Sequence, residues 1–402
     1  MAKEKALEGV RVLDLGQIIA GNFASSLLAD FGAEVIKIEK PGIGDGLRYM
    51  GRVVDGISLH FAVDARNKKN ITLDLKSEEG KSVFLTMVKD ADVVVENFAA
   101  GVLERMGLGY DVLAKVNPRI ILGRVSGYGQ TGPKSGSYGY DRIGLAYGGI
   151  TYLSGEPDGA PMRPGVAIAD YSSGLFCALG ILIALYNRDI AGTGLGQCVE
   201  LGLYESVFRY IETAVADYKL TGEIHERVGN DASTGAPANH YMTKDGQWVA
   251  IASTNDRVFA RFAQAIGRPD LLEDSRYATQ VKRAMVPENK EYIHQLTGEW
   301  IASHTERECA QAFADTVPYT KILSIADIFK EEQYAARNNI VEVPHHKFGT
   351  VSMQGIVPRM SRTPGEVKWA GRPLGSDNEE VFKQILGYSD ADYNRLVEQG
   401  IV

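Results

Sequence analysis

Strands and helices alternate along the first third of the chain, and this order restricts the fold more than any other feature of the sequence. Apolar runs of strand length are separated by segments of helical periodicity and by glycines that end helices, such as Gly32. The predicted strands cover residues 10–15, 34–39, 71–75, 92–96 and 119–125, and the predicted helices cover residues 21–31, 77–89 and 110–116. This alternation predicts an α/β fold whose parallel sheet is covered by helices on both faces.

Ligands of a parallel sheet bind where its strands end at their carboxyl termini. Basic residues recur near the predicted ends, namely Lys37, Lys40, Arg48, Arg52, Lys68, Lys69, Lys76, Arg105 and Lys134. Each alone is typical of a solvated surface charge, but together they would suit an anionic, phosphate-bearing ligand. Residues 127–133 form a glycine-rich segment that would let such a ligand approach the backbone closely.

The first strand and helix resemble a dinucleotide site, because Glu39 ends the second predicted strand as a ribose-binding acid would. Gly16 and Gly21, however, are separated by Gln-Ile-Ile-Ala and do not form the G-x-G-x-x-G pattern. Ile18 and Ile19 would crowd a pyrophosphate. The sequence therefore disfavours a nicotinamide cofactor.

At 402 residues the chain exceeds one ordinary core, so we expect two domains. Residues 221–239 are rich in Gly, Asn, Asp, Ala and Pro, which indicates a linker. Residues 241–252 then read as a hairpin around an Asp245-Gly246 turn. We expect a large domain over residues 1–222, a small α+β domain over 223–329, and a C-terminal part over 330–402 that returns to the large domain.

Charge and composition exclude several classes of protein. A net charge of −8 argues against nucleic acid as a partner. Three cysteines without Cys-x-x-Cys spacing, and a start without an apolar run, fit a cytoplasmic protein. The apolar run over residues 175–186 is too short for a membrane span. The seven histidines lack metal-ligand spacing, so we expect no metal site and place the histidines on the surface or in loops.

Asp170 interrupts an apolar neighbourhood. Residues 166–169 read as a short buried strand and residues 175–186 as a buried helix, so Asp170 should lie at or near the start of that helix. It could be the N-cap, since Asp satisfies free N–H groups well. It could instead be a functional carboxylate, because Ser172, Ser173 and Gly174 leave room for a substrate.

Ordered motifs run nearly from end to end of the chain: residues 7–14 (Leu-Glu-Gly-Val-Arg-Val-Leu-Asp), 32–39, 67–76, 95–98, 105–107 and 126–133, and Asp170 with its helix. With these motifs the chain resembles the class III coenzyme A transferases. That family includes formyl-CoA transferase and carnitine-CoA transferase, and also alpha-methylacyl-CoA racemase.

The resemblance implies a Rossmann-like large domain built from both chain ends, a small domain between them, and an interlocked homodimer. It implies transfer of coenzyme A from an acyl-CoA to a short-chain or dicarboxylic acid, with Asp170 as the nucleophile. Coenzyme A is then a substrate, and no permanently bound cofactor is expected. An acyl-CoA racemase or isomerase, or a subunit of a heteromeric CoA-transferase, remains the alternative.

The resemblance also implies the site residues. Those expected to bind coenzyme A are Ile19, Ala20, Lys40, Leu73, Asp74, Leu75, Lys76, Asn97, Phe98, Arg105, Tyr138, Gly139, Tyr140 and Asp141. Those expected to bind the acid are Gln17, Arg48 and His240. Racemases carry His-Asp where this chain has Tyr140-Asp141, which argues against racemisation.

Overall fold

A computed structural model describes residues 4–231 and 235–402. These residues form two compact units. The first unit comprises the chain up to Thr151, Arg163–Ile224 and Ala335–Val402, and the second comprises Tyr152–Met162 and His225–Tyr334. The first unit thus draws on both ends of the chain, and the predicted domain boundaries at 222/223 and 329/330 stay a prediction.

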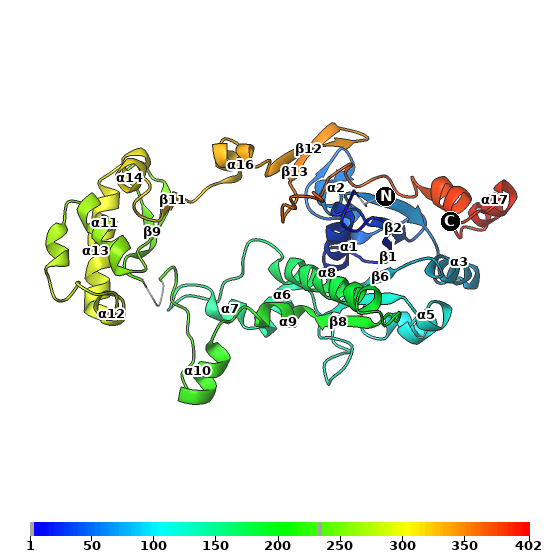
Figure 1. Ribbon diagram of the computed structural model, residues 1–402, viewed down its shortest axis with the longest axis horizontal. Helices are drawn as coiled ribbons and strands as arrows, with labels where there is room; N and C mark the ends of the chain where they lie inside the picture. The colour runs from blue at the N-terminus through cyan, green and yellow to red at the C-terminus, as the bar shows by residue number, and fades with distance from the viewer. Residues whose placement is uncertain (1–3, 232–234) are drawn as a thin grey trace. The chain divides into compact units, whose positions relative to one another are not determined.

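The first unit is built on a six-stranded, entirely parallel sheet with the order β5-β2-β1-β6-β7-β8. Figure 1 labels β1, β2, β6 and β8 of this sheet. The strands are β1 (Arg11–Asp14), β2 (Glu34–Glu39), β5 (Lys68–Thr72), β6 (Val93–Glu96), β7 (Ile121–Ser126) and β8 (Cys198–Gly202). Counted along the chain, this order is 3-2-1-4-5-6, the doubly wound arrangement in which ligands bind where the order reverses. Here the reversal lies between β1 and β6, and the predicted α/β class is confirmed.

Two strands differ from their predictions. The sequence pattern placed the third strand at residues 71–75, but β5 begins at Lys68, whose backbone pairs with Val35 of β2 and whose charged side chain, buried and paired with Asp14, gives no apolar signal. β8 was not predicted, since it is an edge strand whose side chains alternate between exposed and partly buried. A pattern so weakly apolar gives little signal for a strand.

Helices cover both faces of the sheet. One apolar core joins the sheet to α1 and α8, and the other joins it to α3, α5 and the C-terminal η3 and α17. The helical segments of this unit are α1 (Ala20–Asp30), η1 (Gly46–Tyr49), α2 (Leu59–Asp64), α3 (Glu78–Val88), α4 (Val102–Arg105), α5 (Tyr110–Val116), α6 (Asp141–Tyr147), α8 (Ile168–Asp189), α9 (Leu203–Phe208), α10 (Ala214–Thr221), η3 (Glu380–Ile385) and α17 (Asp390–Glu398). Two short helices, α7 (Ile150–Leu153) and α16 (Glu332–Ala336), have residues in both units. Phe382 of η3 and Leu396 of α17 lie in the second of these cores.

Helix α8 differs from the prediction at both its start and its faces. It begins at Ile168, so residues 166–169 do not form the predicted strand, and Val166 is 58% exposed. Four apolar residues in a row were too few to distinguish a strand from the first turn of a helix. Gly174 lets α8 approach α1 closely, because a Cβ there would lie 2.7 Å from the Ala20 carbonyl oxygen.

Only one face of α8 is buried, although the sequence predicted a buried helix. Its other face exposes large apolar side chains at helical spacing, namely Leu175, Leu179, Leu182, Ile183 and Tyr186. At 22 residues, α8 is also the one helix within the described part of the chain that is long and apolar enough to cross a membrane. The inner face instead packs on α1 and the sheet, as in the core helix of an α/β unit.

The second unit has a three-stranded antiparallel sheet, β11-β10-β9, packed against helices around its own core. Its elements are β9 (Ala238–Met242), β10 (Trp248–Ala252), α11 (Asp256–Ala265), η2 (Pro269–Leu272), α12 (Gln280–Met285), α13 (Pro287–Ala302), α14 (Glu306–Phe313), β11 (Tyr319–Lys321) and α15 (Ile325–Ile328). The hairpin predicted around Asp245 and Gly246 is confirmed as β9–β10, and Gly246 has the positive φ of 75° that the turn requires. The first unit also contains two hairpins, β3 (Val53–Val54) with β4 (Ile57–Ser58), and β12 (Ile340–His345) with β13 (Gly349–Gln354).

Candidate active site

A cavity of about 340 Å³ opens at the carboxyl end of the sheet, beside the point where the strand order reverses. Its wall comes from the segments that follow β1, β2, β5 and β6. Seven of the predicted site residues line it: Gln17, Lys40, Leu73, Asp74, Leu75, Lys76 and Phe98. Leu15, Ile38 and Met106 add an apolar surface, so the cavity combines an apolar wall with two exposed ammonium groups, as a phosphate-bearing chain would need.

The other residues predicted to bind coenzyme A lie elsewhere in the same unit. Ile19 and Ala20 are buried at the start of α1 and contact the cores. Arg105 is exposed at the end of α4, next to Met106 of the cavity wall. Tyr138, Gly139, Tyr140 and Asp141 precede or begin α6, where Tyr138 is 85% exposed. Their part in binding coenzyme A stays a prediction.

The loop between β1 and α1 is held in a strained conformation. Ile18 has a φ of 62°, in the left-handed region that a β-branched residue rarely adopts. Asn97, which follows β6, bonds both sides of the Gln17 peptide: its Oδ1 accepts from the Gln17 N–H at 2.7 Å and its Nδ2 donates to the Gln17 carbonyl at 2.8 Å. Asp45 accepts from the Ile18 N–H at 2.9 Å. These bonds determine where Gln17 meets the cavity.

Two fully buried lysines contact this loop and the strand before it. Lys37 donates to the Gly16 carbonyl at 2.7 Å and pairs with Asp45 at 2.9 Å, while Lys68 pairs with Asp14 at 2.9 Å. Burial lowers the pKa of Lys68, and Asp14 does not fully offset it; for Lys37, burial is outweighed by Asp45 and its neighbouring carboxylates, which raise the pKa. The expectation that these two lysines face an anionic ligand is therefore wrong, because their charges are used inside the protein.

Arg48 is also engaged within the protein. Its guanidinium forms a two-pronged ion pair with Glu39, at 2.6 and 2.7 Å, and lies over the ring of Phe61 at 3.8 Å. Its remaining donors reach the Arg372 carbonyl. Glu39 lines the cavity but is neutralised by this pair, so it is not placed as a free ribose-binding acid.

Asp170 lies in the first turn of α8 but does not cap it. The N-cap is Ala167, and the Asp141 carboxylate from α6 performs the capping, with Oδ1 accepting from the Ala169 N–H at 2.9 Å. The N-cap interpretation of Asp170 is therefore wrong. Within residues 4–231 and 235–402, no group donates a hydrogen bond to the Asp170 carboxylate, so that side chain is available for other chemistry.

Burial, followed by repulsion from Asp141, raises the pKa of Asp170 to about 7, and His60 opposes this rise. The helix N-terminus favours a negative charge by only about 0.3–1 kcal/mol, which is less than one pKa unit. Desolvation and the second carboxylate outweigh it. A carboxyl group that titrates near neutrality in a site with other charged groups is typical of functional positions.

His60 was predicted to be a surface or loop histidine, and this prediction is wrong. His60 lies in α2, where its Nε2 contacts the Asp64 carboxylate at 3.1 Å and the Tyr171 hydroxyl at 3.0 Å. Tyr171 donates in turn to Asp64 at 3.0 Å. The spacing of His60 and Asp64, four residues apart, was visible in the sequence, but only the fold brings them to the residue that follows Asp170.

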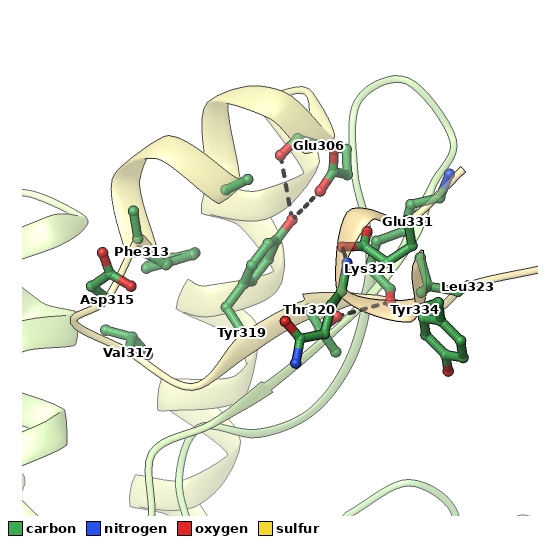
Figure 2. A pocket seen from close by; sticks show the side chains of 13 residues that line it. Glu306, Phe313, Asp315, Val317, Tyr319, Thr320, Lys321, Leu323, Glu331 and Tyr334 are labelled. Carbon is green, nitrogen blue, oxygen red and sulfur yellow. Dashed lines mark hydrogen bonds between the residues drawn. The ribbon is translucent and has the colours of Figure 1, made fainter. Parts of the chain in front are cut away.

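The second unit contains two further cavities. His240, predicted to bind the acid, is exposed on β9 and lines a cavity of about 500 Å³. A cavity of about 560 Å³ lies beside β11, where Figure 2 shows the Tyr319 hydroxyl directed toward Glu306 of α14, 3.4 Å from its carbonyl oxygen. The larger of the two contains none of the predicted site residues. The candidate site is therefore the one at the sheet end of the first unit.

The family model described as CoA-transferase family III matches residues 7–378. The chain belongs to CoA-transferase family III. The class III resemblance inferred from the motifs is thereby confirmed, and this family III chain is a transferase that acts on CoA thioesters.

Relatives of this family III chain match it over nearly its full length. The succinyl-CoA–D-citramalate CoA-transferase of Chloroflexus aurantiacus is 42% identical, over 99% of this chain and 98% of its own. The alpha subunit of succinyl-CoA–L-malate CoA-transferase from the same organism is 40% identical, over 98% of this chain and 92% of its own. The crystal structure of a CAIB/BAIF family protein from Brucella suis is 31% identical and superposes with a TM-score of 0.83, covering 95% of this chain and 100% of the other.

Proposed function

We propose that this enzyme transfers coenzyme A from succinyl-CoA, or a related acyl-CoA, to a short dicarboxylic acid, and that Asp170 carries the acyl group and then the coenzyme A. The support for the substrates is the names of two relatives at about 40% identity, which pair succinyl-CoA with citramalate or malate. Both are transfers between small dicarboxylic acids.

In the proposed mechanism, the Asp170 carboxylate attacks the thioester carbonyl, the C–S bond breaks, and coenzyme A leaves as the thiolate. The product is a mixed anhydride. The thiolate then attacks the aspartyl carbonyl, which releases the first acid as its carboxylate and leaves Asp170 as a CoA thioester. The incoming carboxylate then attacks the aspartyl carbonyl of this thioester and releases the coenzyme A thiolate, which gives a second mixed anhydride. The thiolate attacks the acyl carbonyl of the incoming acid and releases Asp170 as its carboxylate. No step gains or loses a proton. Covalent catalysis of this kind divides one difficult displacement into easier ones.

The observation that carries this proposal is that Asp141 caps α8 and leaves the Asp170 carboxylate unbonded within the described part of the chain. A capping carboxylate would be held by N–H groups and would be a weak nucleophile. The raised pKa of about 7 acts in the same direction, because a carboxylate that is partly desolvated and repelled by Asp141 is more basic than one in water.

We assign the coenzyme A chain to the cavity at the sheet end. Lys40 and Lys76, both exposed at its rim, would bind phosphate groups, and Leu73 and Phe98 would contact the pantetheine. The loop at residues 16–22 lies between this cavity and the start of α8. Gln17 of the loop lines the cavity, and Ile18 packs against the same apolar cluster as Tyr171, the residue after Asp170.

The experiment is to assay Asp170→Ala with panels of acyl-CoA donors and acids by mass spectrometry. We expect wild-type transfer from succinyl-CoA to a dicarboxylic acid, a hydroxylamine-trapped adduct on Asp170, and neither in the variant, which should still bind coenzyme A. Asp158→Ala, at an exposed aspartate, is the matched control. Full activity of Asp170→Ala would overturn the mechanism, and deuterium exchange at the acyl α-carbon would reveal the racemase alternative.

We further propose that the enzyme is a cytoplasmic homodimer that buries the outer face of α8. The support is the row of exposed apolar side chains on that face, including Leu179, Ile183 and Tyr186, because a monomer rarely leaves such a patch in water. The relative named as an alpha subunit keeps a heteromer as the alternative. Light scattering on the purified chain, with Ile183→Glu as the variant, distinguishes a dimer from a monomer that needs a second subunit.

A further inference from the structure

His60 and Asp64 of α2, together with Tyr171 of α8, form a closed three-membered cluster at the start of α8. Each pair of their polar atoms is within hydrogen-bond distance: 3.1 Å for His60–Asp64, and 3.0 Å for both His60–Tyr171 and Tyr171–Asp64. The Tyr171 ring is held in place by an edge contact with Phe23 of α1, with centroids 4.9 Å apart. Three elements thus determine the position of the imidazole.

This cluster has no role in the covalent steps proposed above. CoA transfer requires no general acid or base, since no proton is moved overall. A histidine paired with a buried carboxylate therefore needs another explanation. Asp64 is 5% exposed, and a buried carboxylate next to an imidazole favours its protonated, cationic form.

Among the residues that the structure describes, one cationic group acts on Asp170. Asp141 faces Asp170 from α6 and repels it, and Arg142 and Arg163 interact with Asp141. From α2, His60 is the group that opposes this repulsion. Arg48 of η1 lies over Phe61 of α2, but its guanidinium is directed at Glu39 and at the Arg372 carbonyl, and it is not among the groups that act on Asp170.

Resting on the proposed function, we propose that His60 is a positioning residue that acts as the counter-charge of Asp170, held in its cationic form by Asp64 and oriented by Tyr171, so that the nucleophile stays ionised beside Asp141. The burial of Asp64 and the lowering effect of His60 on the pKa of Asp170 both act in this direction. His60 acts through Asp170 and does not contact the reacting atoms in this proposal.

The test is the pH profile of kcat/KM between pH 5 and 9. In His60→Gln the imidazolium is lost, and a rise of about one unit in the pKa of Asp170 leaves about tenfold fewer ionised molecules at pH 6. We expect activity at pH 6 to fall about tenfold and activity at pH 9 to stay within about twofold of wild type. His60→Lys keeps a positive charge and should restore the wild-type acid limb.

Two further variants separate charge from structure. Asp64→Asn removes the group that holds His60 cationic and should move the acid limb in the same direction as His60→Gln. His304→Gln, at a histidine of the second unit that stacks on Trp300, is the matched control and should leave the profile unchanged.

The outcomes are separable from those of the proposed function. An unchanged profile in His60→Gln, an equal loss at every pH, or a failure of His60→Lys to restore the acid limb would each overturn the role of His60, even if Asp170→Ala is inactive. Full activity of Asp170→Ala would overturn the proposed function itself, and the role of His60 with it.

Discussion

Replacing Asp141 with Asn should make the enzyme more active in mild acid. Asp141 does two things: its Oδ1 accepts the Ala169 N–H at 2.9 Å, and its charge repels the Asp170 carboxylate. Asn keeps an oxygen that can accept this hydrogen bond but has no charge. Asp141→Ala removes both the bond and the charge, so the two variants together separate capping from electrostatics.

The size of the effect follows from the pKa of Asp170, which is about 7. At pH 6, about a tenth of the molecules then carry an ionised nucleophile. If loss of the neighbouring charge lowers the pKa by about one unit, half of them do, and kcat/KM at pH 6 rises about fivefold. Above pH 8 Asp170 is ionised in both proteins and the difference disappears.

The assay is CoA transfer from pH 5 to 8.5, together with urea unfolding. Asp141→Asn should lose no stability at neutral pH, because burial raises the pKa of Asp141 and its charge repels Asp170, whereas Asp141→Ala should be about 1 kcal/mol less stable than Asp141→Asn through the lost cap. An acid limb that stays in place, or that moves to higher pH, would refute the electrostatic argument. A higher KM for acyl-CoA with an unmoved limb would instead indicate that Asp141 contacts coenzyme A, as the family resemblance implies.

Three further predictions concern stability and are measured by urea unfolding. Asp170→Asn should stabilise the protein by about 1–4 kcal/mol at pH 8 and should have no effect near pH 3. The reason is that the pKa of Asp170 is raised to about 7 in the folded protein, so the wild type loses stability as the pH rises from the pKa of the unfolded chain toward 7. Equal stability of the two proteins at pH 8 would contradict this. Lys68→Met should lose about 3–5 kcal/mol of stability, because it leaves the buried Asp14 carboxylate without its ion-pair partner. Lys81→Met, which removes an ion pair with the exposed Glu78, should lose less than about 0.5 kcal/mol. Similar losses in the two variants would refute the distinction between buried and surface pairs. Gly174→Ala places a Cβ 2.7 Å from the backbone of α1 and should lower the stability by about 1–3 kcal/mol. Gly298→Ala in α13, where the nearest contact of a Cβ is at 3.5 Å, should raise it by about 0.5–1 kcal/mol through helix propensity. A gain in both variants would show that α1 and α8 can separate without cost.

Local sequence patterns were sufficient for much of the fold. The strand at residues 34–39 and the helix at residues 110–116 have the predicted bounds, and Ser77, where the helix predicted over residues 77–89 begins, is the N-cap of α3. In each case the signal is short-range: an apolar run between glycines, or a Ser before a helical segment. Where the signal depended on a distant partner it failed. β5 was placed three residues late because its first residue is a lysine, which is buried only through its pairing with Asp14.

The candidate site was only partly predictable for the same reason. The family motifs indicated Asp170 and the cavity residues after β5, but the roles of Asp141 and His60 are relations between side chains far apart in the sequence. Asp141 lies 28 residues from the N–H group that it caps, and His60 lies 111 residues from Tyr171. Neither distance can be read from periodicity.

The sequence by itself determined the α/β class, the order of its elements and the family, because these depend on local periodicity and on motifs that are contiguous in the chain. The tertiary structure decided how each polar group is used. It buries Lys37 and Lys68 within ion pairs. It places the Asp141 carboxylate where it caps α8, and it places His60 beside Tyr171, the residue that follows Asp170. The physical reason is that solvation and pairing, which set the charge and reactivity of a side chain, depend on neighbours that only folding brings together.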